Sequence, residues 1–381
     1  MFITKVKEFM LRVGFIGWRG MVGSVLMDRM RANNDFKKIN AVFFSTSDIG
    51  GVAPDMGQKN KVLLDAYDIK ALLDLDCIVT TQGGDYTNAV MPKLKEAEFN
   101  GFFVDASSAL RISDESLLIL DPLNYNQIVN GIKTGTKVYC GSNCTVSLML
   151  LAISGLLKNN LVEWVNSQTY QAASGAGANN MRELISQCGV MYNAVANDLE
   201  DKNTNILDID NKVSETLRSN KLPTQYFGAA LAGNVLPWID SGLDNGQTKE
   251  EWKAGVEANK ILGLAPNTLK IDGNCVRVGS LRSHSQALTI KLKDSKVSLD
   301  DIEDILKSGN EWVRFVENNK PDTLKYLTPV SVNGTLDIAV GRVRKLNLGD
   351  EYLSMFTVGD QLLWGAAEPI RRMINILVEH A

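Results

Sequence analysis

The chain has 381 residues, which is enough for two or three domains at about 150 residues per domain. With 45% hydrophobic and 22% charged residues, its composition is that of a globular protein and excludes collagen-like, coiled-coil and disordered chains. The net charge is only −4 and no run of Lys or Arg exceeds two residues, which argues against a nucleic-acid-binding protein.

The first 145 residues alternate short apolar runs with helix-like segments. The predicted strands are residues 12–16, 41–44, 76–80, 102–105 and 137–140, and a helix is predicted from about residue 21 to residue 30. Strands separated by helix-length segments indicate βαβ units and a parallel, Rossmann-like sheet. Small or polar residues follow each strand, at the edge where open α/β sheets bind ligands.

After Cys144 the pattern changes. A helical run at 146–157 and a strand at 163–170 precede strand-like segments at 276–278, 287–293 and 337–346, which predict a mixed or antiparallel sheet. Residues 360–379 are amphipathic and predict a terminal helix that packs on the first domain. We therefore expect an α/β protein with a Rossmann-like domain (1–143 with 357–381) and a second, α+β domain (144–356).

Cysteine and histidine counts narrow the kinds of site. Five cysteines, an odd number in a long chain, favour a reducing compartment over a disulfide framework. Of only two histidines, His380 is the penultimate residue, so no metal site is expected. The chain has no run of 18 apolar residues and no signal-peptide core, so we expect a cytoplasmic protein without a membrane partner.

Three glycines, Gly17, Gly20 and Gly23, lie between the first predicted strand and its helix. Glycines there allow a tight turn, a close approach of backbone to a pyrophosphate, and helix–strand packing, so we expect a dinucleotide site. The GxxGxxG spacing departs from the usual GxGxxG, and a glycine-rich turn without a ligand is the alternative.

The end of the second strand bears on the choice of cofactor. It carries the hydroxyl residues Ser45, Thr46 and Ser47, and no carboxylate before Asp48. Because a carboxylate there holds the ribose of NAD, whereas hydroxyls and Arg19 can bind a 2′-phosphate, NADP is favoured over NAD.

Cys144 lies at a predicted strand-to-helix junction. A helix N-terminus lowers the pKa of a thiol, and its amides, with the Asn143 side chain, could hold an oxyanion, so Cys144 is a candidate nucleophile. The alternative is an inert, buried cysteine, which we expect for Cys77, Cys188 and Cys275, while Cys140 is expected to be packed at a strand end.

His284 is the candidate base for this thiol, because the chain offers hardly any other imidazole. A structural histidine is the alternative. A papain-like protease is a poor fit, since Asn143 interrupts the Cys-Gly-Ser-Cys string and no Trp follows Cys144. Arg111 and Lys253 are candidate phosphate ligands, although surface ion pairs would explain both.

Long strings of the sequence, taken together, resemble the aspartate-semialdehyde dehydrogenases of Gram-negative bacteria. They include residues 14–24, 43–47, 82–88, 143–149, 170–175, 243–247, 250–253, 275–279, 284–286 and 357–365. The resemblance implies a homodimer whose larger interface lies in the second domain. It also implies that L-aspartate 4-semialdehyde, phosphate and NADP+ interconvert with L-4-aspartyl phosphate and NADPH, toward lysine, threonine and methionine.

The resemblance also implies roles for the matched residues. The nucleophile would be Cys144, the acid–base group His284, and the residue that orients the intermediate Gln171. Ligands of the substrate and of phosphate would be Arg277 (α-carboxylate), Glu250 (α-ammonium), Arg111 and Lys253 (phosphate). The NADP site would be lined by Gly17, Arg19, Gly20, Met21, Val22, Thr46, Ser47, Gln82, Ser174, Gly175 and Gln361.

Three features depart from the family. About nine residues precede the usual start, so Met10 is a candidate initiator; Ala176 replaces a usual glycine; and the segment around Lys202 lacks a proline that often contacts the cofactor. Three alternatives stay open: an N-acetylglutamyl-phosphate reductase, a non-catalytic NADP sensor and a cysteine hydrolase. A carboxylate at Glu250 suits a free α-ammonium and argues against the acetylated substrate.

Overall fold

A computed structural model describes residues 10–381 and divides them into two compact units. The first unit runs to Asn143 and includes Glu257–Thr268 and Leu363–Ala381, and the second comprises Cys144–Val256 and Leu269–Leu362. The candidate initiator Met10 begins the described part of the chain.

The first unit is built on a parallel sheet, which counts seven strands among the described residues, in the order β3-β2-β1-β4-β5-β7-β6. The strands are β1 (Arg12–Ile16), β2 (Asn40–Ser45), β3 (Leu64–Asp65), β4 (Cys77–Thr80), β5 (Phe102–Asp105), β6 (Ser116–Ile119) and β7 (Val138–Gly141). The predicted Rossmann-like sheet is confirmed; the short strands β3 and β6 were not predicted.

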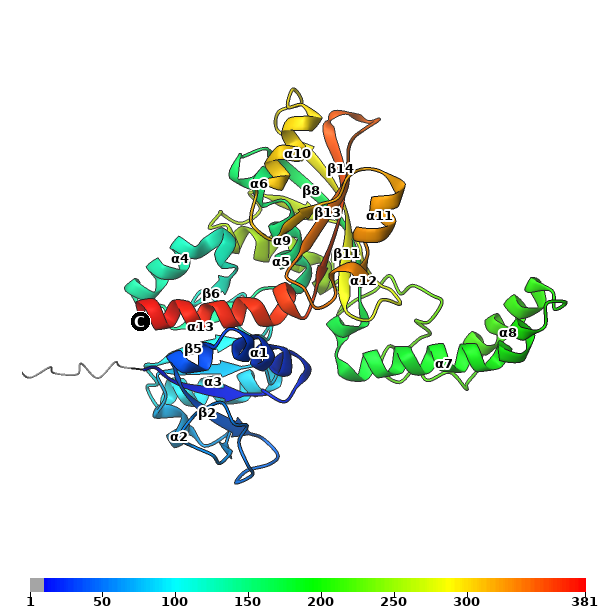
Figure 1. Ribbon diagram of the computed structural model, residues 1–381. Helices are drawn as coiled ribbons and strands as arrows, with labels where there is room; N and C mark the ends of the chain where they lie inside the picture. Colours follow the sequence, from blue (N-terminus) through cyan, green and yellow to red (C-terminus); the bar gives the residue numbers. More distant parts are fainter. Residues whose placement is uncertain (1–9) are drawn as a thin grey trace, which may run out of the picture. The chain divides into compact units, whose positions relative to one another are not determined.

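Helices cover both faces of this sheet (Figure 1). They are α1 (Met21–Ala32), α2 (Ile69–Leu73), α3 (Gly84–Glu96), α4 (Asp121–Thr134) and α13 (Glu368–His380), with a 3-10 turn, η1, at Asp35–Lys38. Because side chains alternate along a strand, Phe43 packs in the cluster with α1, α4 and α13, whereas Val42 and Phe44 pack with α2 and α3.

The predicted terminal helix does pack on the first unit, but its predicted start was wrong. Asp360 ends a strand, and a π-helical turn, η3 (Leu363–Ala367), precedes α13. Ion pairs also fix α13: Glu368 accepts from Arg29 Nε at 2.8 Å, and Arg371 Nε donates to the buried Asp35 at 2.6 Å.

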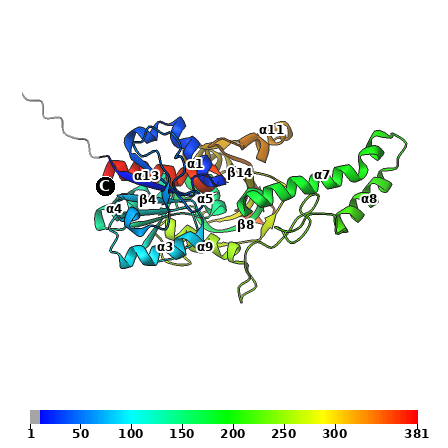
Figure 2. The ribbon, with the colours of Figure 1, turned by 90° about the horizontal axis from the view of Figure 1, so that it is seen from below.

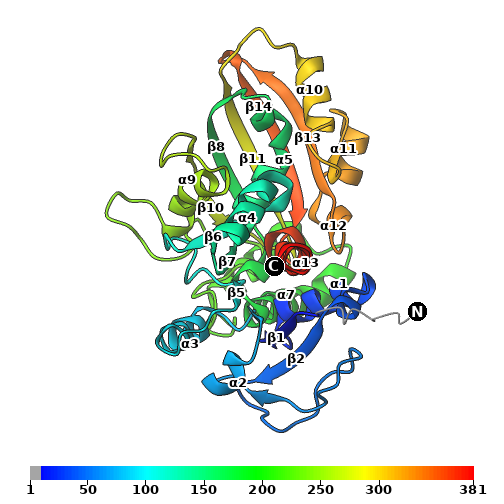
Figure 3. The same ribbon diagram turned by 90° about the vertical axis from the view of Figure 1, so that its left-hand side faces the viewer.

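The second unit contains a mixed sheet with the path β10-β8-β11-β14-β13-β12, and β9 pairs with β8 (Figure 3). Its strands are β8 (Val162–Gln171), β9 (Lys270–Asp272), β10 (Cys275–Arg277), β11 (Ser283–Leu292), β12 (Val313–Phe315), β13 (Ile338–Leu346) and β14 (Gly349–Asp360). The central pairs β8/β11, β11/β14 and β14/β13 are antiparallel, which confirms the predicted mixed or antiparallel sheet, although β14 itself was not predicted. Strand β11 begins four residues earlier than predicted, so His284 lies on it.

The helices of the second unit are α5 (Cys144–Ala152), α6 (Ser154–Lys158), α7 (Ala178–Glu200), α8 (Ile206–Arg218), α9 (Lys249–Ile261), α10 (Leu299–Lys307), α11 (Lys320–Tyr326) and α12 (Pro329–Val332). A 3-10 turn, η2 (Ala173–Ala176), follows β8. The predicted helix at 146–157 is two helices that meet at Ile153. Helices α7 and α8 project together from the sheet of this unit, and the segment around Lys202 is the turn between them (Figures 1 and 2).

Two boundaries of the units differ from the expected ones. The expected boundary at 356/357 falls inside β14, whose residues up to Asp360 pair with β11, and the units divide after Leu362 instead. The other division falls inside α9, since Glu257–Thr268 is part of the first unit. Within residues 10–381, no helix combines the length and apolar character needed to cross a bilayer.

Candidate active site

The glycine turn after β1 is shaped for a close approach of backbone. Gly17 has a φ of 78°, and a Cβ there would lie 2.5 Å from the Gln82 nitrogen. A Cβ on Gly23 would lie 2.2 Å from the Gly17 oxygen, so α1 packs against the turn only because position 23 lacks a side chain. Gly20 is the N-cap of α1, and Met21 and Val22 form its first turn. This geometry fits the pyrophosphate of a dinucleotide at the helix N-terminus.

Hydroxyl residues at the end of β2 contact the guanidinium of Arg19. Arg19 Nη2 donates to Ser45 Oγ at 2.9 Å and lies 3.4 Å from Ser47 Oγ. Asp48 forms an ion pair with the same guanidinium, with its Oδ2 at 3.0 Å from Arg19 Nη1. Arg19 is still half-exposed, so one face of this cation is accessible to an anion. Thr46 lies in the same segment, and Gln82 follows β4 at the same carboxyl edge of the sheet.

In the second unit, the structure brings the predicted nucleophile and its imidazole together. Cys144 begins α5, and its Sγ lies 3.2 Å from His284 Nε2 on β11. His284 is buried, and the Ala172 N–H donates to its Nδ1 at 2.9 Å. Burial, followed by the positive charge of Arg277, lowers the pKa of His284 well below its ordinary value, so the ring is neutral at pH 7.

Arg277 and Gly175 complete the surroundings of this imidazole. Arg277 Nη1 donates to the Ala172 carbonyl at 2.7 Å, and burial lowers the pKa of this guanidinium without discharging it. A Cβ on Gly175 would lie 2.9 Å from Arg277 Nη1 and 3.1 Å from His284 Nε2. The backbone of Gly175 therefore lies directly against both side chains.

A chain of polar contacts runs from Gln171 at the end of β8 to α9. Gln171 Nε2 lies 3.2 Å from Thr169 Oγ1 and 3.3 Å from Glu250 Oε1, and Glu250 Oε2 accepts from Lys253 Nζ at 3.1 Å. Lys253 also donates to Asp240 Oδ2 at 2.7 Å. Burial acts to lower the pKa of Lys253, but Glu250 and Asp240 outweigh it, so this pKa is raised and the ammonium stays charged.

The predicted cofactor residues of the second unit also meet. Ser174 Oγ donates to the Arg282 carbonyl at 3.0 Å and lies 2.8 Å from Gln361 Oε1. Gln361 follows β14, whose last residue, Asp360, accepts from Arg282 Nε at 2.7 Å. Ser174 and Gln361 therefore form one buried polar pair beside the loop that leads to His284.

In the first unit, Arg111 and Asn143 share a buried carboxylate. Glu257 Oε1 lies 3.3 Å from Arg111 Nη1, and Glu257 Oε2 accepts from the Asn143 N–H at 2.5 Å. Lys260 Nζ donates to the carbonyls of Arg111 and Ser113 at 2.8 and 2.7 Å. Sequence reasoning missed Glu257 and Lys260. Their spacing from Glu250 and Lys253, three or four residues each time along one helix, was the available signal.

The other cysteines differ from Cys144 in their burial and their chemical surroundings. Burial raises the pKa of Cys140 and Cys275 to about 12, so both thiols stay protonated at neutral pH. Cys77 is buried as expected, but the expectation for Cys188 was wrong, because Cys188 is exposed on the projecting helix α7. No group of three or more His, Cys, Asp or Glu side chains within residues 10–381 is arranged to hold a metal.

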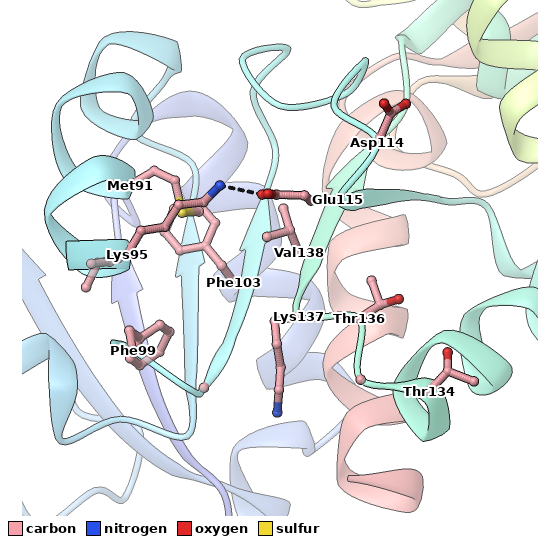
Figure 4. A pocket seen from close by; sticks show the side chains of 13 residues that line it. Met91, Lys95, Phe99, Phe103, Asp114, Glu115, Thr134, Thr136, Lys137 and Val138 are labelled. Atoms are coloured by element: carbon pink, nitrogen blue, oxygen red, sulfur yellow. Dashed lines mark hydrogen bonds and ion pairs between the residues drawn. The ribbon is translucent and has the colours of Figure 1, made fainter. Parts of the chain in front are cut away.

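None of the predicted site residues lines a hollow of about 440 Å³ in the first unit (Figure 4). Its rim includes Gly101, Glu115 and Lys137, which stand just before β5, β6 and β7, and Lys95 pairs with Glu115 across it. It therefore opens at the amino ends of these strands, whereas α/β sheets bind ligands at the carboxyl ends.

A parallel sheet with this glycine turn, and a mixed-sheet unit with a thiol–imidazole pair among buried charges, define the semialdehyde dehydrogenase class. The sequence model of the semialdehyde dehydrogenase NAD binding domain matches residues 12–131, and that of the dimerisation domain matches residues 153–364. The aspartate semialdehyde dehydrogenase from Francisella tularensis is 52% identical, with a TM-score of 0.92 over 97% of this chain and 100% of that chain. The chain belongs to the aspartate semialdehyde dehydrogenase family, which confirms the resemblance.

More distant members share the fold. Aspartate semialdehyde dehydrogenase II from Vibrio cholerae, in complex with ASA, is 20% identical, with a TM-score of 0.79 over 97% of this chain and 99% of that chain. The enzyme from Candida albicans with NADP is 16% identical, with a TM-score of 0.64 over 98% and 99% of the two chains.

Proposed function

We propose that the protein interconverts L-aspartate 4-semialdehyde, phosphate and NADP+ with L-4-aspartyl phosphate and NADPH, and that biosynthesis uses the reductive direction. The observation that carries the proposal is the 3.2 Å contact between Cys144 Sγ and His284 Nε2, within one cluster with Gln171, Glu250 and Arg277. The high identity to a family member over nearly the whole chain supports the same reaction.

In this proposal Cys144 attacks the carbonyl carbon and carries the acyl group as a thioester, and His284 Nε2 is the hydrogen-bond partner of the sulfur. Gln171 orients the acyl group, and the Asn143 side chain, with the amides at the start of α5, would hold the oxyanion. NADP, when bound, supplies the hydride acceptor of the oxidation or the hydride donor of the reduction. The residues that would hold it are those of the glycine turn, Thr46, Ser47, Gln82, Ser174, Gly175 and Gln361.

In this proposal, buried charged side chains bind the substrate. Arg277, at 6% exposure, can take the α-carboxylate with two parallel hydrogen bonds, and Glu250 can take the α-ammonium. Lys253 and Arg111 are the candidate phosphate ligands. Glu250 disfavours an N-acetylated substrate, because a neutral amide gains nothing from a buried carboxylate.

Arg19 carries the preference for NADP in this proposal. Its guanidinium sits among hydroxyls at the end of β2 and can bind a 2′-phosphate. We expect Arg19→Ser to lower kcat/KM with NADP+ about tenfold or more, the loss of one charged hydrogen bond, and to leave NAD+ use nearly unchanged. Equal losses with both cofactors would refute this role.

The proposed assembly is a homodimer formed through the second unit. Its match to a dimerisation domain supports the assembly. An exposed apolar stripe on α7 also supports the homodimer. Its residues Ile185, Tyr192 and Leu199 recur every seven positions, and each is more than half exposed.

One assay separates the candidate functions. Purified protein is mixed with aspartate semialdehyde, phosphate and NADP+, and NADPH formation is followed by absorbance. The proposal requires turnover that depends on phosphate and is abolished in Cys144→Ala. Turnover only with N-acetylglutamate semialdehyde indicates the related reductase, NADP binding without turnover indicates a sensor, and cofactor-free hydrolysis indicates a cysteine hydrolase.

A further inference from the structure

The two ring nitrogens of His284 have different neighbours, and this difference fixes where the proton sits. Nδ1 lies 2.9 Å from the Ala172 nitrogen, whose N–H points at it and donates. A nitrogen that accepts a hydrogen bond carries a lone pair and no proton. A neutral imidazole has one proton, so that proton is on Nε2, the nitrogen 3.2 Å from Cys144 Sγ.

We infer that His284 in the resting enzyme is the neutral Nε2–H tautomer, a hydrogen-bond donor to the Cys144 sulfur rather than the base that deprotonates it. The inference deepens the proposed function and rests on it for its catalytic meaning. The backbone of Ala172 becomes a positioning element, since its N–H selects the tautomer that faces the nucleophile.

The charges around the ring agree with a neutral imidazole. An imidazolium would direct a second N–H at the Ala172 N–H, so two donors would oppose each other in a buried site. Arg277, on β10, is a buried cation whose charge acts on Cys144 and also disfavours a charged His284. Glu250 on α9, an acid whose charge acts on Arg277, is engaged by Lys253 and Gln171.

Ala172 fixes both partners of the sulfur. Its N–H holds the His284 ring, and its carbonyl accepts from Arg277 Nη1 at 2.7 Å. The residue is fully buried, directly after β8, in an extended conformation with φ −66° and ψ 155°. Ala172 therefore positions two groups at once: Arg277, the positive charge that favours a thiolate, and His284, the hydrogen-bond donor to its sulfur.

The attack on the aldehyde then needs no proton transfer to His284. The thiol proton leaves to solvent, and the thiolate electron pair forms the C–S bond while the carbonyl π pair moves to the oxygen. One negative charge enters the step on sulfur and leaves it on oxygen. The Nε2–H donates first to the sulfur and then to this oxyanion, where a preorganised donor stabilises the transition state.

Histidine nitrogen NMR tests the inference directly. The chain has only two histidines, so protein labelled with ¹⁵N-histidine gives two ring systems, and His380→Gln leaves His284 alone. At pH 7, without substrate or cofactor, we expect a neutral ring protonated at Nε2. A ring protonated at Nδ1, or at both nitrogens, would overturn the inference. Neither result depends on turnover, so the proposed function stands or falls separately in the assay.

A pair of variants tests the donor role. His284→Gln keeps an N–H donor of similar reach, whereas His284→Leu has none. We expect iodoacetamide to alkylate Cys144 about tenfold faster in the Gln variant than in the Leu variant at pH 7, since a donor to a charged group is worth about that factor. Equal rates in the two variants, both far below wild type, would show that the imidazole acts as a base and would refute the donor role.

Discussion

Gly175 lies against Arg277 and His284, the two side chains that act on the nucleophile. A substitution there tests whether catalysis depends on their exact positions. In Gly175→Ala, the added Cβ would lie 2.9 Å from Arg277 Nη1 and 3.1 Å from His284 Nε2, so these side chains must shift. Because such small misplacements of reacting groups can cost about 100-fold, we expect kcat to fall by one to two orders of magnitude. The loss is measured with saturating substrates.

Gly189 on α7 is the matched control. A Cβ there meets nothing within 4 Å, and a helix prefers alanine to glycine by about 1 kcal/mol. We expect Gly189→Ala to keep full activity, because one methyl group on the apolar stripe of α7 leaves the character of the stripe unchanged and lies away from the reacting groups. If Gly175→Ala were as active as Gly189→Ala, the close contacts at Gly175 would have no catalytic importance.

The lowered pKa of His284 makes the stability of the enzyme depend on pH. In the unfolded chain this ring binds a proton below about pH 6.5, whereas the folded chain keeps it neutral to lower pH. The unfolded state then binds more protons, so the free energy of unfolding falls as the pH drops below about 6.5. We expect wild type to lose about 1 kcal/mol more than His284→Gln between pH 7.5 and 5.5.

Urea unfolding followed by circular dichroism at the two pH values gives this difference. His380→Gln serves as the control, because His380 lies exposed at the end of α13 and should leave the loss as large as in wild type. Identical losses in wild type and His284→Gln would show that His284 titrates normally in the fold.

For single residues, the sequence predicted the side chains of the candidate site but not the main-chain groups that hold them. Cys144 stood out by its place before a predicted helix, and His284 by the scarcity of histidine. The Ala172 peptide carries no signal in its residue type, since any residue except proline presents the same N–H and carbonyl. Glu257 was missed because its partners, Arg111 and the Asn143 N–H, are more than 100 positions away.

Among the elements, α9 links several predicted site residues in sequence. Its C-terminal part, Glu257 and Lys260, holds Arg111 at the guanidinium and at the carbonyl. Lys260→Met keeps the shape of the side chain but leaves the carbonyls of Arg111 and Ser113 without this donor. We expect a rise of about tenfold in KM for phosphate, with KM for NADP+ nearly unchanged, because the loop with Arg111 loosens.

Two variants of Glu257 separate its position from its charge. Glu257→Asp keeps the charge but is too short to contact both Arg111 and the Asn143 N–H, whereas Glu257→Gln keeps the reach. If position matters, the Asp variant shows the larger rise in KM for phosphate. A larger rise in the Gln variant would assign the effect to charge instead.

The elements themselves were only partly predictable. The parallel strands of the first unit are buried apolar runs between turns and were found, except for the short β3 and β6. Strand β14 was missed although Leu353, Met355 and Thr357 alternate inward along it. The apolar residues Leu362 and Leu363 fit a helical period as well, and only pairing with β11, which the sequence does not reveal, decides that Asp360 ends a strand.

For the whole molecule, the exposed stripe on α7 is the feature that a single chain does not explain. Ile185, Tyr192 and Leu199 stand on an exposed flank of α7, next to the face that carries the buried Leu184 and Val195, and Ile206 and Leu207 of α8 are also mostly exposed. Burying such residues stabilises by about 1.5–3 kcal/mol each, so a second copy of the chain that covers the stripe gains several kcal/mol.

A charge in this stripe should therefore weaken the homodimer. We expect Leu199→Glu to shift the protein toward the monomer in sedimentation velocity at micromolar concentration, because a carboxylate buried at an interface without a partner costs several kcal/mol. Val52→Glu, at an apolar position that is 85% exposed in the first unit, is the control and should sediment as wild type. A Leu199→Glu protein that remains fully dimeric would place the interface on another surface of the second unit, and the mixed sheet would then be the next surface to test.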